Sequence, residues 1–133
     1  MGMEIELHQI EGRRFAIRAR GNEVIVDDTV EAGGPGDGFR PTELLLGALA
    51  ACMAGTMTNF ATDQDITIDG ITMSVTDEVE KAPTRIGGIT VSMTVHADAD
   101  ARQAASLERV ASACKIHNTL KHSPQIDVDF EVV

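Results

Sequence analysis

Hydrophobic and polar residues alternate along the first part of the chain, a pattern typical of half-buried β-strands. The alternation runs through residues 3–9 and 14–20 and resumes at residues 23–27, after Gly21 and Asn22. That Gly-Asn pair fits a two-residue hairpin turn. We therefore predict three strands joined by tight turns into an antiparallel meander. The residues predicted to face inward are Ile5, Leu7, Phe15, Ile17 and Ala19.

The alternation gives way to a long uncharged segment between Glu43 and Asp63. Its residues are mostly good helix formers, and Pro41 fits the first turn of a helix. A helix that is apolar all round has to be buried on every side, in a protein core or between two subunits. The length approaches the roughly 20 residues of a membrane span. Small and polar residues interrupt it, however, and the chain has no Trp or Tyr for an interfacial belt, so no membrane span is expected.

Two further alternating stretches, at residues 65–79 and 89–95, predict a long hairpin in which Gly70 marks a bulge or a change of direction. The period changes to that of an amphipathic helix between residues 98 and 114, and a last strand is predicted at residues 126–132. The predicted order is βββαββαβ, which is an α+β fold with antiparallel sheet around two principal helices. A chain of 133 residues is long enough for one core, so residues 1–133 are expected to form a single domain.

Charge and composition exclude several functional classes. Eleven basic residues against 21 acidic ones give a net charge of −10, which argues against a nucleic-acid partner. The N-terminus lacks the features of a secretory signal, so a cytoplasmic protein is expected. The glycine-rich segment at residues 28–39 lacks the Lys-Ser/Thr pair of a phosphate-binding loop, and we interpret it as a flexible connection.

The residues best suited to carry chemistry are the only two cysteines, Cys52 and Cys114, each on its own predicted helix among apolar neighbours. If the two helices pack side by side, the thiols approach disulfide range. The alternative is that both are small buried hydrophobes. His117 follows Cys114 by three positions, which leaves a zinc site as a third reading, although a fourth ligand is missing. Glu43 fits the positive end of the central helix, where it satisfies the helix start or orients an Arg.

The residues PTELLLGALAAC, ending at Cys52, and ACKIHNTL, around Cys114, resemble the corresponding motifs of the OsmC/Ohr family of thiol-dependent hydroperoxide-reducing proteins. The predicted element order is similar as well, so the resemblance covers nearly the whole chain. The likeness is greatest to the small OsmC-like branch of the family.

The resemblance implies an intertwined homodimer with its long helices at the centre and two active sites at the subunit interface. It implies that Cys52 attacks the peroxide and becomes a sulfenic acid, and that Cys114 condenses with it to a disulfide. A dithiol of the dihydrolipoamide type would reduce that disulfide, and no cofactor or metal is implied. An Arg–Glu pair stabilises the thiolate in this family; Arg13, then Arg14 and Arg40, are the candidates here, with Glu43.

This chain departs from the family pattern at two positions. The family's glutamate corresponds to Thr42, one position before Glu43, and its Cys-Pro pair is Cys114-Lys115 here. Without the proline, the second helix is expected to run on past Cys114. Two hypotheses follow: a homodimeric, cytoplasmic peroxidase of peroxiredoxin-like activity, or a non-catalytic OsmC-like protein that binds an apolar small molecule or a partner at the dimer cleft.

Overall fold

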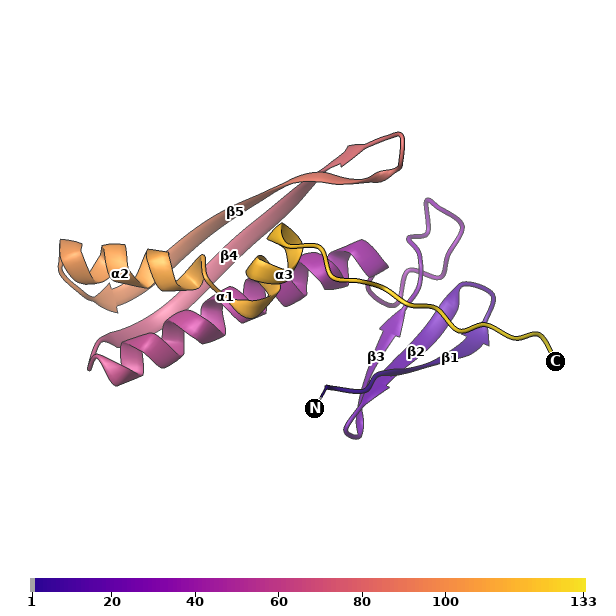
Figure 1. Ribbon diagram of the computed structural model, residues 1–133, viewed down its shortest axis with the longest axis horizontal. Helices are drawn as coiled ribbons and strands as arrows, with labels where there is room; N and C mark the ends of the chain where they lie inside the picture. The colour runs from indigo at the N-terminus through magenta and orange to yellow at the C-terminus, as the bar shows by residue number, and fades with distance from the viewer. Residues whose placement is uncertain (1) are drawn as a thin grey trace. The chain divides into compact units, whose positions relative to one another are not determined.

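The structure, a computed structural model, describes residues 2–133. In chain order the elements are β1 (Glu6–Glu11), β2 (Arg14–Ala19), β3 (Asn22–Val26), α1 (Pro41–Asp63), β4 (Thr67–Glu80), β5 (Arg85–Asp98), α2 (Ala101–Ala111) and α3 (Lys115–Lys121) (Figure 1). They divide into two compact units, one up to Gly47 and one from Ala48 onward, so that α1 begins in the first and continues in the second. The predicted α+β class with antiparallel sheets is confirmed.

The first unit contains the predicted meander, with strand order β1-β2-β3 and antiparallel pairing throughout. Its β2–β3 turn uses Arg20 and Gly21, both at positive φ, which suits the twist of a tight hairpin. The predicted inward face is only partly right. Phe15 and Ile17 are half-buried, while the fully buried residue of β2 is Ala16, on the opposite face.

The second unit is built around the hairpin of β4 and β5, whose register shifts at Gly70 as the sequence predicts. Because side chains alternate along a strand, one face of the hairpin carries its apolar residues and the other is rich in Ser and Thr. The apolar face packs against α1 and α2. The buried core consists of Leu49, Met53, Met57, Ala61, Ile66, Leu107, Ala111 and Cys114.

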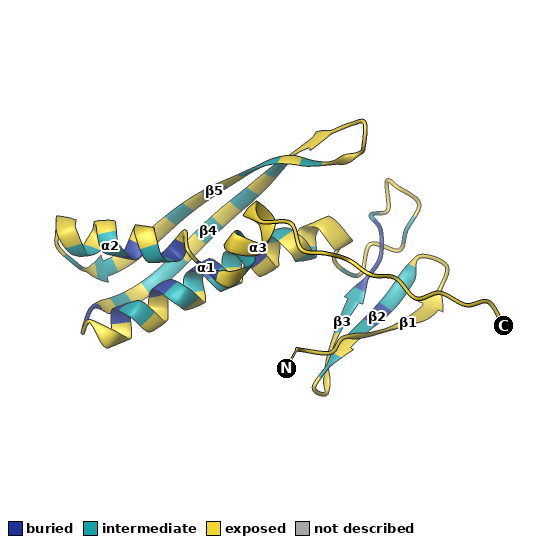
Figure 2. Ribbon diagram, viewed as in Figure 1, coloured by how far each residue is buried: buried dark blue, intermediate teal, exposed yellow. Residues whose placement is uncertain are grey.

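Helix α1 is buried along one stripe only, so of the two expected surroundings, a core or a subunit interface, the core of this chain covers one side of the helix. Residues four apart, namely Leu49, Met53, Met57 and Ala61, are buried, whereas other apolar residues such as Leu45 remain exposed (Figure 2). The helix is long and apolar enough to cross a membrane, and 22% of its 18-residue apolar stretch is buried, but a single such helix is weak evidence for a span. A uniformly apolar helix thus keeps apolar surface uncovered in the isolated chain.

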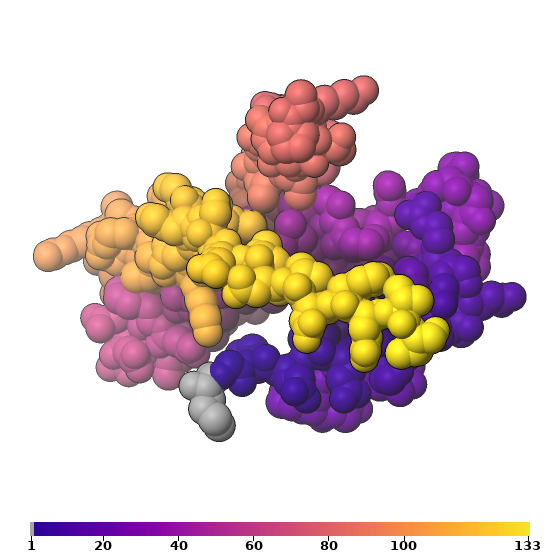
Figure 3. Space-filling view, turned by 45° about the vertical axis from the view of Figure 1, so that its right-hand side comes forward, coloured from indigo at the N-terminus to yellow at the C-terminus, as the bar shows by residue number. Residues whose placement is uncertain are grey.

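The end of the chain differs from the prediction in two ways. The helical region stops at Ala111 and restarts as α3, and the predicted last strand is an extended segment without strand pairing. Figure 3 shows this segment at the surface. Its alternating apolar side chains are between 79% and 84% exposed, because within the described residues 2–133 no strand edge pairs with it. They are Ile126, Val128, Phe130 and Val132.

Candidate active site: a pair of cysteines

Cys114 does not continue the preceding helix, contrary to the sequence-based expectation. It is the N-cap of α3, in an extended conformation, and its Sγ accepts a hydrogen bond from the backbone N–H of His117 at 3.3 Å. The first N–H groups of any helix lack partners within the helix, and a side-chain acceptor at the N-cap satisfies one of them. The sulfur of Cys114 takes this part, so the helix restarts here without the family's proline.

Cys52 reaches the same helix start from the middle of α1. Its Sγ accepts a hydrogen bond from the backbone N–H of Ile116 at 3.4 Å. Cys52 is half-buried, Cys114 is buried, and both are free thiols. The structure therefore brings together the two cysteines that the sequence singled out, with consecutive backbone N–H groups of α3 directed at their two sulfurs.

The surroundings shift the two thiol pKa values in opposite directions. Burial is the largest influence on Cys52 and raises its pKa, but hydrogen bonds from the Ile116 N–H, the Cys114 thiol, the Lys115 N–H and the Thr56 hydroxyl together bring that pKa below its ordinary value. Burial also dominates at Cys114, and the neighbouring Cys52 adds to it, so the pKa of Cys114 is raised despite the bonds from the N–H groups. The negative charge therefore favours Cys52, and the proton favours Cys114.

The arginines that the sequence offers as partners of the thiolate lie in the first unit, where they surround the acidic residues Asp27 and Asp28. Arg13 Nη1 is 2.8 Å from Asp28 Oδ2, and Arg40 Nε is 3.3 Å from Asp28 Oδ1. Arg14 pairs with Asp27 at 3.4 Å and also with Asp37. Each of the three candidate arginines thus pairs with an aspartate.

Glu43 is exposed and serves the start of α1. Its Oε1 accepts a hydrogen bond from the backbone N–H of Arg40 at 2.7 Å. Within residues 2–133 its carboxylate forms no ion pair with an arginine side chain. The structure thus gives Glu43 a helix-capping contact.

The buried pair Asp27 and Asp28 was not predicted from the sequence. Asp27 accepts hydrogen bonds from the N–H groups of Asp37 and Gly38 at 3.0–3.1 Å and so ties the two ends of the glycine-rich segment together. A side chain at Gly38 would meet a backbone oxygen at 2.3 Å. The segment is therefore closely packed rather than a loose connection. The sequence feature that could have indicated this arrangement is a pair of acidic residues directly after a strand and before clustered glycines.

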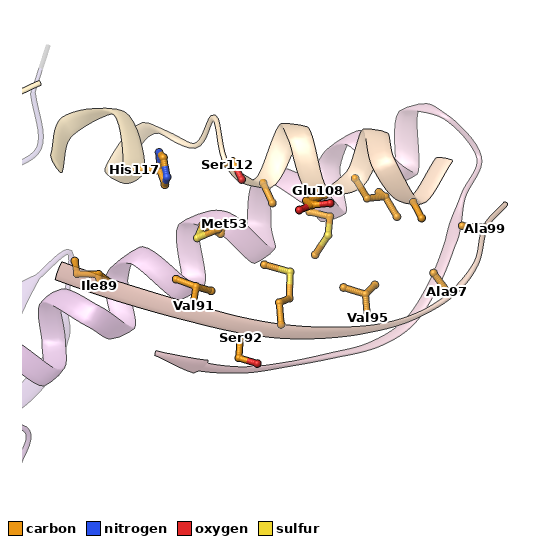
Figure 4. A pocket seen from close by; sticks show the side chains of 15 residues that line it. Met53, Ile89, Val91, Ser92, Val95, Ala97, Ala99, Glu108, Ser112 and His117 are labelled. Atoms are coloured by element: carbon orange, nitrogen blue, oxygen red, sulfur yellow. The ribbon is translucent and has the colours of Figure 1, made fainter. Parts of the chain in front are cut away.

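A cavity of about 840 Å³ lies in the second unit between β5, α1 and α2. Most of the residues that line it are apolar, and Figure 4 shows Val91 and Val95 of β5 directed toward the helices and His117 of α3 directed toward Met53. His117 Nδ1 is the one buried side-chain nitrogen or oxygen without a hydrogen-bond partner in residues 2–133. In the same range no three His, Cys, Asp or Glu side chains group as metal ligands, so the zinc reading of Cys52, Cys114 and His117 has no site within this chain.

The family model for OsmC-like proteins matches residues 34–129, a range that includes both cysteines and the motifs around them. This chain belongs to the OsmC family. No curated protein matches the sequence significantly.

Solved structures agree with this family membership. An OsmC-like protein from Mycoplasma pneumoniae is 23% identical and has a TM-score of 0.80, with 92% of this chain and 89% of that chain covered. A protein from Psychrobacter arcticus 273-4, named for osmotic stress and a detoxification response, is 27% identical with a TM-score of 0.80 and coverage of 90% and 89%. The organic hydroperoxide resistance protein OhrB of Bacillus subtilis is 22% identical with a TM-score of 0.59 and coverage of 92% and 93%.

Proposed function

We propose that this OsmC-family protein is a thiol-dependent peroxidase that reduces organic hydroperoxides. One observation carries the proposal: Cys52 and Cys114 meet at one helix start, where hydrogen bonds lower the pKa of Cys52 and burial raises that of Cys114. The thiolate is the nucleophilic form of cysteine. A thiolate next to a protonated thiol is the arrangement that a two-cysteine redox cycle requires.

The first step is attack of the Cys52 thiolate on the terminal peroxide oxygen. The S–O bond forms as the O–O bond breaks, the departing alkoxide takes a proton to become an alcohol, and Cys52 becomes a sulfenic acid. Cys114 then attacks the sulfenic sulfur, which forms the Cys52–Cys114 disulfide and releases water. One hydroperoxide and two thiols thus give one alcohol, one water and one disulfide.

The rest of the cycle and the auxiliary residues also belong to the proposal. A dithiol of the dihydrolipoamide type would return the disulfide to two thiols by exchange. Arg13, whose side chain is 75% exposed beside Asp28, is the proposed cation near the thiolate, and Glu43 is proposed to hold an arginine in place. Both are secondary contributions, because neutral hydrogen-bond donors already lower the Cys52 pKa.

We also propose that the working form is a cytoplasmic homodimer in which residues 1–133 act as one OsmC-like domain. Support comes from apolar surface that each unit leaves uncovered. In the second unit this is the other side of α1 and the segment at residues 126–132, and in the first unit it is β1 with the residues before it, such as Met3 and Ile5. Uncovered apolar surface of this extent is a mark of protein interfaces.

The decisive experiment is a stoichiometric dose of cumene hydroperoxide followed by peptide mass spectrometry without reduction. Rapid loss of both thiols and a Cys52–Cys114 crosslinked peptide are expected. Cys114→Ser is the matched variant, and it should give one trappable sulfenic acid at Cys52 per chain. Two unreacted thiols in the wild-type protein would sink the peroxidase assignment and leave the alternative, a non-catalytic protein that binds an apolar small molecule or a partner.

A further inference from the structure

Helix α3 is weakly anchored compared with α1 and α2, which both have fully buried residues. It has seven residues, and none of them is fully buried. Isolated helices shorter than about 12–15 residues are only marginally stable in water, so α3 depends on its contacts with the rest of the protein. Ile116 packs against the core, whereas Lys115 and residues 118–121 are exposed. The segment that follows, residues 122–133, is exposed as well.

The contacts at the start of α3 are made to sulfur. The Ile116 N–H donates to Cys52 Sγ, and the His117 N–H donates to Cys114 Sγ. The Lys115 N–H and the Cys114 thiol also donate to Cys52. Hydrogen bonds to an ionised acceptor are roughly twice as strong as those between neutral groups, so these bonds are strongest when Cys52 is a thiolate. The reduced cysteine pair therefore stabilises the start of α3.

Oxidation to the Cys52–Cys114 disulfide weakens all of these bonds together. A disulfide has neither a negative charge nor an S–H group, so the Cys114 donor is lost and each sulfur becomes a weak neutral acceptor. The first N–H groups of a helix have no partners within the helix, and leaving them unsatisfied costs free energy. Oxidation therefore removes stabilisation from a helix that has few other contacts.

His117 adds a free-energy cost to the packed position of α3. Its Nδ1 is buried and has no hydrogen-bond partner within residues 2–133. Figure 4 shows its imidazole directed from α3 toward Met53 of α1. A buried polar atom without a partner costs free energy, and water supplies the partner once the atom becomes exposed. Movement of α3 away from the core relieves this cost.

Burial of the cysteine pair also limits how a reductant reaches the disulfide. Thiol–disulfide exchange requires that the attacking sulfur approach one of the two bonded sulfurs, and its rate depends on access. Cys114 is 1% exposed, and Cys52 is half-buried. A displacement of α3, which begins directly after Cys114, exposes both.

We infer that disulfide formation between Cys52 and Cys114 releases α3 from the core and thereby exposes both sulfurs to the dithiol reductant. This inference rests on the proposed function and adds to it how the reductant reaches the disulfide. Reduction restores the two sulfur acceptors, and α3 returns to its packed position.

The exchange itself consumes one dithiol. A thiolate of the reductant attacks one cysteine sulfur, the S–S bond breaks, and the other cysteine leaves as a thiolate. The second thiol of the reductant loses its proton, attacks the mixed disulfide and closes a ring, which frees the remaining cysteine. One protein disulfide and one dithiol thus give two cysteine thiols and one cyclic disulfide.

Hydrogen–deuterium exchange of the full-length protein tests the inference. Reduced protein is compared with protein oxidised by diamide, which joins thiols without a peroxide, and peptide mass spectrometry without reduction verifies the crosslink. The backbone amides of α3 should exchange about tenfold faster in the oxidised protein, as expected for the loss of hydrogen bonds to a charged acceptor. Helix α2 is the internal control, because Asp100 and Gln103 cap its start, and its exchange should not change.

Two variants change the opening of α3 and keep both sulfurs. His117→Leu removes the unpaired nitrogen but keeps the backbone N–H, so α3 of the oxidised protein should exchange about tenfold more slowly than in oxidised wild type. Reduction of its disulfide by dihydrolipoamide should slow as well.

Thr119→Ala raises the helix propensity at an exposed position and should slow exchange of α3 by roughly two- to threefold. This variant keeps the test valid if His117→Leu does not fold. Alkylation of Cys52 in the reduced protein should be the same in both variants as in wild type, because the donors to its sulfur remain.

Unchanged or slower exchange of α3 after oxidation would overturn the inference, since the crosslink would then hold the helix in place. Equal acceleration in α2 and α3 would also overturn it, because it would reflect a general loss of stability. If α3 opens in the diamide-oxidised protein but no hydroperoxide is consumed, the opening stands and the peroxidase assignment fails. If hydroperoxide is reduced through the disulfide while α3 stays protected, the peroxidase assignment stands and the opening is wrong.

Discussion

The starts of α1 and α3 meet the same structural need with different acceptors. At α1, the carboxylate of Glu43 accepts the Arg40 N–H at 2.7 Å in an exposed position. At α3, the sulfurs of Cys114 and Cys52 accept the N–H groups of His117 and Ile116 at 3.3 and 3.4 Å, largely away from solvent.

The difference lies in what a hydrogen bond does to each acceptor. At Glu43 the bond from the Arg40 N–H satisfies a backbone donor and stabilises the start of the helix. A thiol titrates above neutral pH, and the same kind of bond increases the thiolate fraction and hence the reactivity. Comparable contacts thus stabilise the start of α1 and lower the pKa of Cys52 at the start of α3.

The largest expected effect comes from removing the sulfur of Cys52. Cys52→Ser should lower hydroperoxide turnover by roughly 10³-fold or more, because a serine hydroxyl has almost no ionised form at neutral pH and is not activated by a base here. Turnover is measured by the loss of cumene hydroperoxide with a dithiol reductant. Retention of wild-type turnover in this variant would show that Cys52 is not the nucleophile.

Removing Cys114 should stop catalytic turnover of the hydroperoxide while the Cys52 thiol still reacts once. Cys114→Ala lacks the resolving thiol, so catalysis should stop after about one sulfenylation per chain. It also lacks a hydrogen-bond donor to Cys52, so the pKa of Cys52 should rise. The pH dependence of iodoacetamide alkylation at Cys52 gives that pKa, and its midpoint should move to higher pH. A midpoint at lower pH would contradict the role of the Cys114 thiol as a donor.

Lys115→Pro changes the donors at α3 and keeps the helix start. Proline suits the first turn of a helix but has no N–H, so one of the bonds that lower the Cys52 pKa is lost. Alkylation of Cys52 at pH 7 should slow by a few-fold. Lys115→Gln is the control, since it removes the charge and keeps the N–H. If both variants slow the reaction equally, the charge of Lys115 matters rather than its N–H.

Glu43→Ala should have the smallest effect on chemistry. Loss of the capping contact should lower the free energy of unfolding by about 0.5–1 kcal/mol, as is usual for helix caps. The alkylation rate of Cys52 should change by only a few-fold. Urea denaturation and the alkylation assay check the two parts. A rate loss above a hundredfold would mean that Glu43 acts on the thiolate and would end the contrast between the two helix starts.

The sequence allowed much of the fold to be predicted, because the evidence is local. Alternation along residues 65–79 and 89–95 reflects a strand with one apolar face, and the structure has β4 and β5 there with the predicted irregularity at Gly70. The helical period predicted between residues 98 and 114 likewise contains α2, whose N-cap is Asp100. The break before Cys114 was missed, because sulfur is an unusual cap and the helical period continues through it.

The candidate site was predictable only in part. Cys52 and Cys114 stood out as the only thiols, and the family motifs around them identified their type. The environment of each thiol was not predictable, because it depends on backbone groups of α3 that lie 63 or more positions from Cys52 in sequence. The buried pair Asp27 and Asp28 escaped notice for a similar reason, since its partners belong to the far side of a loop.

The sequence by itself determined strands β1 to β5, helices α1 and α2 and the two candidate reactive residues, because periodicity and residue type are properties of short segments. Tertiary structure alone decided which thiol has the lowered pKa, that His117 lines a cavity, and that the last alternating segment lacks a strand partner within residues 2–133. These outcomes depend on distances between atoms far apart in the chain, and such distances exist only once the packing of α1, α2 and the β4–β5 hairpin is fixed.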